Sequence, residues 1–377
     1  MLDRKLKICL ICDTRSIHYQ RWIRDLKRQG HELYIFSPFR ETIDQENVEF
    51  VPTPKAPFPL FKSVKTILKM LYRVKLAFDI RKKLKVIKPD LVHAHFLTDS
   101  GWIGAWVNYH PFVVTAHGSD VLIHPKESFW QRQGNRFVLK RANKVIMVAN
   151  HLKKDLLKLG CKENKLEFIP NYADDRFLIS ESKLTSKYKN IEVTPNIVSA
   201  RALEPVYSVE TLIKAAQIVI GHYPDARIFI INSGSEYQKL KSLAQSLNIE
   251  NNIEFVGKIS HDELTKYFKL SHIYISTALS DGLSVTTLEG FASGLFPILT
   301  EIPANNAILN QGLNGAMFPC MDYIRLSEQI MNVINSRESL TKTCSKNIHL
   351  INNIFTRRAV LKLMENVYRD AIDSFVN

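Results

Sequence analysis

Two acidic residues bracket the start of one predicted helix, and their spacing suits binding chemistry. The segment 276–294 reads STALSDGLSVTTLEGFASG; it follows an apolar run typical of a buried strand and becomes helical over 285–292. Asp281 precedes the helix and Glu289 lies about two turns deeper, so we expect both carboxylates to face one cleft. Carboxylates suit sugar hydroxyls, and the free N–H groups of a helix start favour a phosphate. The pattern fits a nucleotide-sugar. The same residues would also occur in an ordinary helix, with Asp281 as its N-cap and Glu289 on a solvated face.

Length and composition predict a globular protein with two domains. The chain has 377 residues, too many for one core, and a hydrophobic share of 45%. No apolar run is long enough to span a membrane and the start lacks a signal-peptide core, so we expect a cytoplasmic protein. The five cysteines are scattered, which predicts no disulfide framework, and Cys9 and Cys12 lie in an apolar strand typical of buried thiols.

The excess of positive over negative charge lies entirely in the first half of the chain. Residues 1–180 hold 32 Lys and Arg against 18 Asp and Glu, whereas the remainder holds 19 of each. The segment 55–88 carries eleven of these cations against the single acid Asp79, with apolar residues at helical spacing between them. This pattern predicts one or two basic amphipathic helices that contact an anionic membrane surface. Nucleic acid could compete with a membrane as the partner of these helices, but we do not expect it. The alternative to any partner is a lysine-rich helix face that is simply solvated.

Strand and helix patterns alternate along the whole chain. We expect a first domain over 1–172, a linker over 173–194, a second domain over 195–352, and a final helix over 353–377 that packs back on the first domain. The predicted architecture is α/β, with two Rossmann-like domains that each contain a parallel sheet and face each other across a cleft. Ligands bind at the carboxyl ends of such strands, where this sequence has Arg15, the pair His93 and His95, and the turn 116–120.

Several segments in this order resemble the GT-B glycosyltransferases of the family 4 kind. Asp281, Glu289 and Gly294 match the acidic pair, small-residue helix and glycine of the donor-binding half, with Asp281 where the family usually has Glu. Arg201 lies in a segment similar to the one whose arginine binds the donor diphosphate, and His117 matches a histidine that contacts the donor sugar. The other similar segments are 88–95, 115–120, 169–171, 256–258 and 314–315.

The sequence departs from the family pattern at three further places. The lysine that often follows the diphosphate-binding arginine is replaced by the cation-free run Val206-Tyr207-Ser208. The glycine pair after the first strand is replaced by residues 13–16, where Arg15 could supply a charge instead, and residues 232–234 keep one glycine of a usual pair. These changes are compatible with an altered donor or with lost activity.

The resemblance implies a retaining glycosyltransferase that uses no enzyme nucleophile. Glu289 would bind the ribose, Asp281 the donor sugar, and His117 the sugar or the diphosphate. We expect the donor contacts to come from Arg15, Arg201, Lys258, Gly282, Leu283, Ser284, Val285 and Glu289. We expect the acceptor contacts to come from His93, His95, Ser119 and Asp120.

The expected substrates follow from the same resemblance and from the charge. The chain has no Asp-x-Asp motif, so we expect no metal, and no cofactor besides the nucleotide-sugar substrate, for which we favour UDP over GDP. The acceptor would be a saccharide, in our interpretation lipid-linked, at the inner face of the cytoplasmic membrane. Two alternatives stay open: a nucleotide-sugar epimerase on this fold, and an inactive or divergent member that binds nucleotide-sugars. A phosphorylase would need a lysine site for pyridoxal phosphate, for which the sequence shows no pattern.

Overall fold

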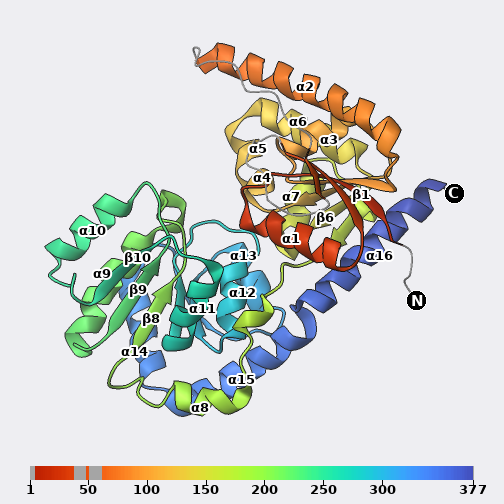
Figure 1. Ribbon diagram of the computed structural model, residues 1–377. Helices are drawn as coiled ribbons and strands as arrows, with labels where there is room; N and C mark the ends of the chain where they lie inside the picture. The colour runs from red at the N-terminus through yellow and green to blue at the C-terminus, as the bar shows by residue number, and fades with distance from the viewer. Residues whose placement is uncertain (1–4, 38–47, 51–61, 377) are drawn as a thin grey trace. The chain divides into compact units, whose positions relative to one another are not determined.

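The chain forms two α/β units, each built on one parallel sheet. The computed structural model describes residues 5–37, 48–50 and 62–376 (Figure 1). One unit comprises Met1–Ile169 with Leu361–Asn377, and the other comprises Pro170–Val360. Both sheets are parallel with helices between successive strands, which is the arrangement of a Rossmann-like domain. The predicted fold class of two Rossmann-like domains is therefore confirmed.

The sheet of the first unit has seven parallel strands. Their order is β3-β2-β1-β4-β5-β6-β7. The strands are β1 (Lys7–Ile11), β2 (Glu32–Phe36), β3 (Val48–Phe50), β4 (Leu91–His95), β5 (Phe112–Ala116), β6 (Lys144–Met147) and β7 (Leu166–Phe168). Every residue of β4 and β5 is buried, as expected for central strands covered on both faces. The chain reverses its direction of travel between β1 and β4, so the ligand crevice of this sheet lies at their carboxyl ends.

The helices of the first unit include one layer in which three helices pack in a row. The helices are α1 (Ile17–Arg28), α2 (Lys62–Ile87), α3 (Ser100–Val107), α4 (Ser119–Leu122), α5 (His124–Glu127), α6 (Phe129–Arg141) and α7 (Lys153–Lys158). Trp102 on α3 joins the row, because the Arg73 guanidinium of α2 lies 5.5 Å from its ring and its indole N–H donates to Asn135 of α6 at 3.0 Å. Figure 1 shows α2, α3 and α6 together in this unit.

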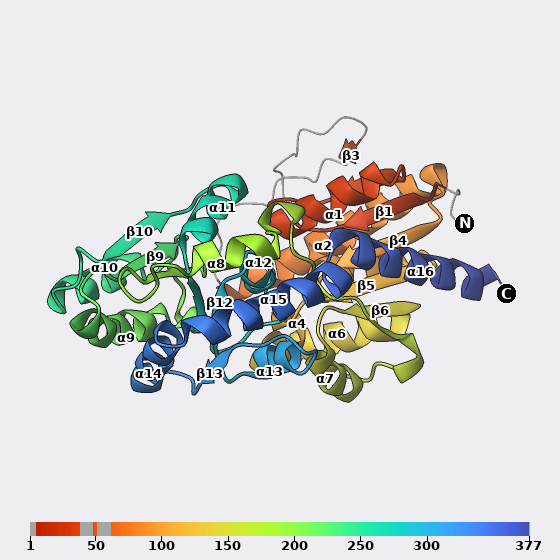
Figure 2. The ribbon, with the colours of Figure 1, turned by 90° about the horizontal axis from the view of Figure 1, so that it is seen from below.

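The last helix, α16 (Arg357–Val376), packs on the first unit over most of its length. The division between the units falls within it, after Val360. Its Tyr368 hydroxyl lies 2.7 Å from Nδ1 of His93, and Gln29 of α1 donates to its Glu365 at 3.1 Å. Figure 2 shows α16 beside the strands of the first sheet. The C-terminal segment expected over 353–377 thus consists of the end of α15 and, from Arg357 as its amphipathic pattern predicts, the helix itself.

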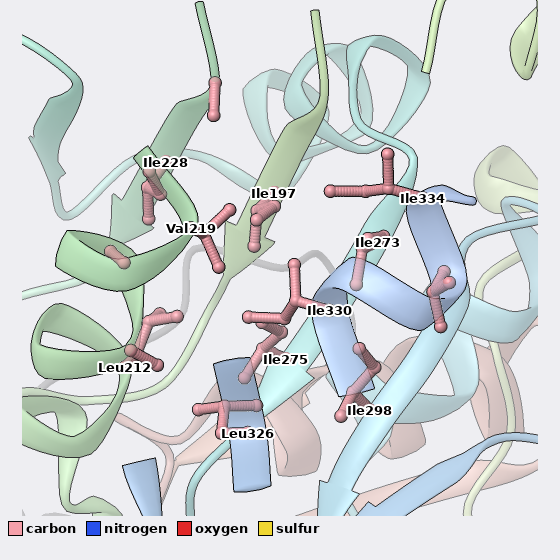
Figure 3. Packing of buried hydrophobic residues seen from close by; sticks show 14 of the residues in the cluster. Ile197, Leu212, Val219, Ile228, Ile273, Ile275, Ile298, Leu326, Ile330 and Ile334 are labelled. Atoms are coloured by element: carbon pink, nitrogen blue, oxygen red, sulfur yellow. The ribbon is translucent and has the colours of Figure 1, made fainter. Parts of the chain in front are cut away.

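The sheet of the second unit has six parallel strands around a large apolar core. Their order is β10-β9-β8-β11-β12-β13. The strands are β8 (Asn196–Ser199), β9 (Arg227–Ile231), β10 (Ile253–Gly257), β11 (Ile273–Ser276), β12 (Phe296–Thr300) and β13 (Ala316–Phe318). The helices are α8 (Leu184–Lys187), α9 (Val209–His222), α10 (Tyr237–Ser246), α11 (His261–Leu270), α12 (Val285–Ala292), α13 (Pro303–Leu309), α14 (Tyr323–Ile334) and α15 (Arg337–Ile354). Figure 3 shows strand isoleucines meeting apolar residues of α9 and α14.

The segment that we expected to be a linker, 173–194, belongs to the second unit. Its side chains Leu184, Tyr188 and Ile191 are fully buried in the core of that unit. The Tyr188 hydroxyl donates to the carbonyl of Gly294 at 2.8 Å and lies 3.2 Å from that of His272. Apolar residues scattered among many polar ones anchor this segment, which is why composition alone suggested a linker.

The basic segment of the first half forms a single helix in its described part. Residues 51–61, including Lys55, Leu60 and Phe61, lie outside the described residues, and side chains on α2 are described from Met70 onward. Leu71 and Phe78 are 59% and 60% exposed, and Lys75, Lys82 and Lys85 share their face of the helix. This face therefore combines exposed apolar side chains with lysines.

Candidate active site

Buried Arg201 and half-buried Asp281 form an ion pair at the carboxyl edge of the second sheet, where the topology predicts a ligand site. Arg201 follows β8 and Asp281 follows β11, the two strands between which the chain reverses direction, so their loops meet at the carboxyl edge. Nη2 of Arg201 lies 2.5 Å from Oδ2 of Asp281, and Nη1 donates to the Ser284 hydroxyl at 2.6 Å. The guanidinium is 7% exposed. Burial opposes its charge, but the Asp281 carboxylate together with the Tyr274 and Tyr207 hydroxyls outweighs this and raises the pKa of Arg201.

The ring of Tyr207 packs against the Arg201 guanidinium. Its ring centroid lies 4.4 Å from the Arg201 guanidinium carbon, a cation–π contact. Tyr207 comes from the run Val206-Tyr207-Ser208, where related sequences often have a lysine. Nε of Arg201 is buried and, among the described residues, has no hydrogen-bond partner. The guanidinium is therefore held in place by Asp281, Ser284 and Tyr207 at the start of α12.

The start of α12 is capped by a side chain rather than bare. The Ser284 hydroxyl accepts from the backbone N–H of Thr287 at 3.2 Å, and the Asp281 carboxylate accepts from the N–H of Gly282 at 2.8 Å. Gly282, Leu283, Ser284 and Val285 are all buried. The expectation that this helix start offers only free N–H groups is therefore corrected: Ser284 serves both the helix and Arg201.

Glu289 is buried and contacts a histidine that the sequence analysis did not identify. Its side chain is 1% exposed, and its Oε1 lies 3.0 Å from Nε2 of His261 on α11. The other nitrogen of His261 lies 2.8 Å from Nη2 of Arg176, which also binds Asp174. The two carboxylates expected to face one cleft thus have different partners, Arg201 for Asp281 and this network for Glu289. No sequence spacing links His261 to Glu289, because they come from separate helices.

Lys258 lies apart from this cluster. It follows β10, an edge strand separated from β8 by β9, and its side chain is exposed. Among the hydrogen bonds and ion pairs of the described residues, Lys258 takes part in none. Its assignment as a donor contact stays a prediction.

The rings of His93, His95 and His117 cluster at the carboxyl ends of β4 and β5 in the first unit. His93 is fully buried, with Nε2 2.8 Å from the Thr115 hydroxyl and Nδ1 beside Tyr368. The rings of His93 and His95 lie 4.2 Å apart, and that of His117 lies 5.7 Å from His95. Burial lowers the pKa of His93 to about 3, with a contribution from His117. Both nitrogens of His93 are occupied inside the protein, so the structure gives it a structural role in place of the expected acceptor contact.

Asp120 holds the turn that carries His117. Its fully buried carboxylate accepts from the backbone N–H groups of Leu97, His117 and Gly118 at 2.9, 3.0 and 2.8 Å. Burial raises its pKa, against the opposing effect of these hydrogen bonds. The expected acceptor contact of Asp120 is thus replaced by a positioning role. His117 and Ser119 are half-buried in the same turn, and their assignment as ligand contacts stays a prediction.

Arg15 is exposed in the loop after β1. Its Nε and Nη2 donate to both carboxylate oxygens of Asp13 at 2.9 and 2.8 Å. The structure thereby places Arg15 at the carboxyl end of the strand, as expected, and gives it an ion-pair partner two residues away.

The described residues give no indication of a bound metal or a membrane span. Among 5–37, 48–50 and 62–376, no three His, Cys, Asp or Glu side chains gather as metal ligands. Cys9 and Cys12 are free and buried, and burial raises the pKa of Cys12 to about 12. In that same part of the chain, no helix has the length and apolar character needed to cross a bilayer.

Two family models match consecutive parts of the chain. The model of glycosyl transferase 4-like proteins matches residues 7–149, and that of glycosyl transferases group 1 matches residues 181–349. With the two Rossmann-like units, these matches define a glycosyltransferase of the GT-B fold. The chain belongs to this class and, within it, to the proteins similar to family 4.

Curated relatives support the same class. An uncharacterized glycosyltransferase of Methanocaldococcus jannaschii is 25% identical over 75% of this chain and 76% of its own length. The alpha-monoglucosyldiacylglycerol synthase of Streptococcus pneumoniae is 23% identical over 78% and 69%, respectively. The N-acetyl-alpha-D-glucosaminyl L-malate synthase of Bacillus anthracis is 18% identical over 93% and 92%.

Solved structures share the fold over nearly the whole chain. A sucrose-phosphate synthase from Thermosynechococcus elongatus superimposes with a TM-score of 0.80 at 15% identity, covering 98% of this chain and all of that one. The HepE protein of Anabaena in complex with UDP superimposes with a TM-score of 0.77 at 14% identity, covering 97% of this chain and 99% of that one. WaaG, a glycosyltransferase of lipopolysaccharide biosynthesis, gives 0.71 at 12%, covering 95% and 99%. At these identities the likeness concerns the fold.

Proposed function

We propose that this glycosyltransferase transfers a sugar from a UDP-sugar to a lipid-linked saccharide acceptor, with retention of anomeric configuration and without a metal ion. The product would serve cell-envelope polysaccharide, lipopolysaccharide or glycolipid synthesis on the cytoplasmic side of a membrane. Two glycolipid synthases among the relatives and a UDP-bound structural neighbour support this choice of donor and acceptor class.

One observation carries the proposal: the buried Arg201 guanidinium with its unpartnered Nε. Departure of a nucleoside diphosphate builds negative charge, which a fixed guanidinium in a water-poor site stabilises more than it stabilises the ground state. Asp281, Ser284 and Tyr207 hold this guanidinium in one orientation before the substrate arrives. An incoming diphosphate would then meet a positive charge that is already oriented.

The test is donor binding followed by analysis of the product. A thermal-shift screen of UDP-, GDP- and dTDP-sugars should raise the melting temperature with UDP-sugars, since a ligand that binds only the folded state stabilises it. With the best donor and a panel of glycolipid and soluble sugar acceptors, we expect transfer to the glycolipids and NMR of the product to show retention. Inversion, or transfer only to soluble acceptors, would refute the corresponding part of the proposal.

Arg201→Gln should abolish the thermal shift while leaving the free protein folded. Arg227→Gln is the matched control, because Arg227 is an exposed arginine at the start of β9 in the same unit. If the two variants keep the same shift, the diphosphate does not bind at Arg201. If wild type binds nucleotide-sugars but transfers nothing to any acceptor, the alternative of a binding protein without transferase activity gains the support.

A further inference from the structure

A basic cavity lies in the first unit, outside the residues assigned to transfer. Its volume is about 330 Å³, and it opens among α4, α5, α6 and α7. The lining residues are Val121, Pro125, Lys126, Arg132, Arg136, Asp155, Lys158 and Leu159. Val121, Pro125 and Leu159 are buried, so they form an apolar floor under charged walls.

The charges of this cavity are far from balanced. Four of the eight lining side chains are cations, and Asp155 is the single acid, 3.9 Å from Lys158. Among the described residues, no carboxylate forms an ion pair with Lys126, Arg132 or Arg136. Three neighbouring cations without counter-charges repel one another, so an anion between them would be bound favourably. The forked guanidinium groups of Arg132 and Arg136 suit phosphate oxygens in particular.

An exposed aromatic pair lies at the start of α6, the helix that supplies Arg132 and Arg136 to the cavity. Phe129 and Trp130 open α6 and are 64% and 76% exposed, with ring centroids 5.7 Å apart. Phe129 lies three residues before Arg132 and seven before Arg136, which places the three on one side of the helix. Large aromatic rings next to cations are costly in water and favourable in the headgroup region of a bilayer.

Asn135 anchors the middle of α6 to its neighbours in the first unit. The Asn135 amide donates to the carbonyl of Asp120 at 2.7 Å and accepts from the Trp102 indole. Through Trp102 the helix is also tied to Arg73 of α2. The exposed lysine face of α2 and the cavity therefore belong to one layer of helices in the first unit.

We propose that this cavity binds the phosphate of a membrane lipid headgroup while Phe129 and Trp130 enter the headgroup region. A soluble phosphate compound shares the chemistry of the phosphate, but it gives no reason for an exposed Phe and Trp at the rim. The proposal rests on the membrane contact in the proposed function and deepens it: α2 supplies general attraction, and the cavity supplies a specific headgroup site.

The test compares two double variants that each remove two positive charges, one pair from the lining of the cavity and the other from outside it. Binding to phosphatidylglycerol-containing vesicles is measured for wild type, for Arg132→Gln with Arg136→Gln, and for Lys140→Gln with Lys154→Gln. Lys140 and Lys154 are exposed on α6 and α7 but do not line the cavity. We expect the cavity variant to bind at least about tenfold more weakly and the control to stay within about twofold of wild type. Circular dichroism checks that both variants remain folded.

A second arm separates a lipid from a soluble phosphate. Phe129→Ser with Trp130→Ser should weaken vesicle binding severalfold, and inorganic phosphate or glycerol 3-phosphate at millimolar concentration should compete poorly. Equal losses in the cavity and control variants, or no vesicle binding by wild type, would overturn the proposal. Full vesicle binding by the aromatic variant together with strong competition by glycerol 3-phosphate would assign the cavity to a soluble ligand and overturn it too. Transfer in detergent micelles reports separately on the proposed function, because it does not require a bilayer.

Discussion

Half-buried His261 and buried Glu289 form a hydrogen-bonded pair, with Nε2 of the histidine 3.0 Å from Oε1 of the carboxylate. The pair joins the start of α11 to the second turn of α12, and Asp174 and Arg176 complete it on the other side of the imidazole. A carboxylate held in this way has a fixed orientation. That is what the recognition of sugar hydroxyls requires.

The first prediction concerns this pair. Glu289→Gln should lower kcat/KM at least about tenfold, because it removes a charged contact to the donor. His261→Gln should act through Glu289 and mainly raise the KM for the nucleotide-sugar, with a smaller change in kcat. Steady-state kinetics measure both, and Glu338→Gln, an exposed site on α15, is the control. A kcat loss in His261→Gln equal to that in Glu289→Gln would argue for direct contact between His261 and the substrate.

The second prediction separates Arg201 from its partner. Arg201→Ala should lower kcat/KM at least about tenfold, since a charge-assisted contact to the diphosphate is lost. Asp281→Asn keeps an oxygen for the guanidinium and should cost less, in the range of a few-fold. Kinetics on both variants decide the order, and a larger loss for Asp281→Asn would indicate that Asp281 contacts the donor sugar directly.

The third prediction concerns metal ions. If Arg201 and the capped start of α12 neutralise the leaving diphosphate, activity should survive an excess of EDTA. The measurement is the initial rate after chelation and again after addition of Mg²⁺ or Mn²⁺. A rate that is lost with EDTA and restored by either ion would contradict the proposed metal-independent mechanism.

The fourth prediction is a loss of stability in mild acid through His272. Burial lowers its pKa to about 4, helped by Lys187, and its Nδ1 accepts from the backbone N–H of Asn196 at 3.0 Å. The folded state thus binds fewer protons than the unfolded chain below the ordinary histidine pKa. Its contribution is complete above about pH 6.5 and decreases as the pH falls toward 4, by about 2 kcal/mol near pH 5.

A variant isolates this contribution from other acid effects. In His272→Asn the amide oxygen can accept from Asn196 but does not titrate. Melting temperatures at about pH 7.5 and about pH 5 should therefore fall less in the variant than in wild type. An identical fall would show that other groups, such as buried His93, account for the acid sensitivity.

The fifth prediction is salt-sensitive membrane binding through α2. Wild type should sediment with anionic liposomes at low salt, and binding should weaken as salt rises, because surface potentials decay within about 10 Å at about 0.1 M. Changing Lys82, Lys83 and Lys85 to Glu should abolish most of the binding. The control changes Lys241, Lys269 and Lys346, exposed lysines of the second unit, to Glu. If the two triple variants bind equally, or wild type ignores the liposomes, the lysine face of α2 is simply solvated.

The sequence by itself determined the fold class and the order of most elements. Apolar runs of strand length alternate with helical patterns, and such alternation has few solutions other than parallel sheets covered by helices. The helix α12 begins and ends as expected because a polar turn precedes it and Ser293 and Gly294 follow it. The short strands β3 and β13 and the helix α15 were not anticipated. In α15 the buried positions Leu340, Cys344 and Ile348 recur every four residues, but polar neighbours obscure the pattern.

Only the tertiary structure decided which partner each polar side chain has. Arg201 and Asp281 are 80 residues apart in the sequence, and His261 reaches Glu289 from another helix. Such pairs depend on how neighbouring strands bring their loops together. Residue spacing along one element does not predict these contacts. The same holds for His93 and Asp120, whose hydrogen bonds with Tyr368 and with three backbone N–H groups turn expected ligand contacts into supports. The reason is physical: a buried polar group must be paired, and the fold, not the local sequence, supplies the partner.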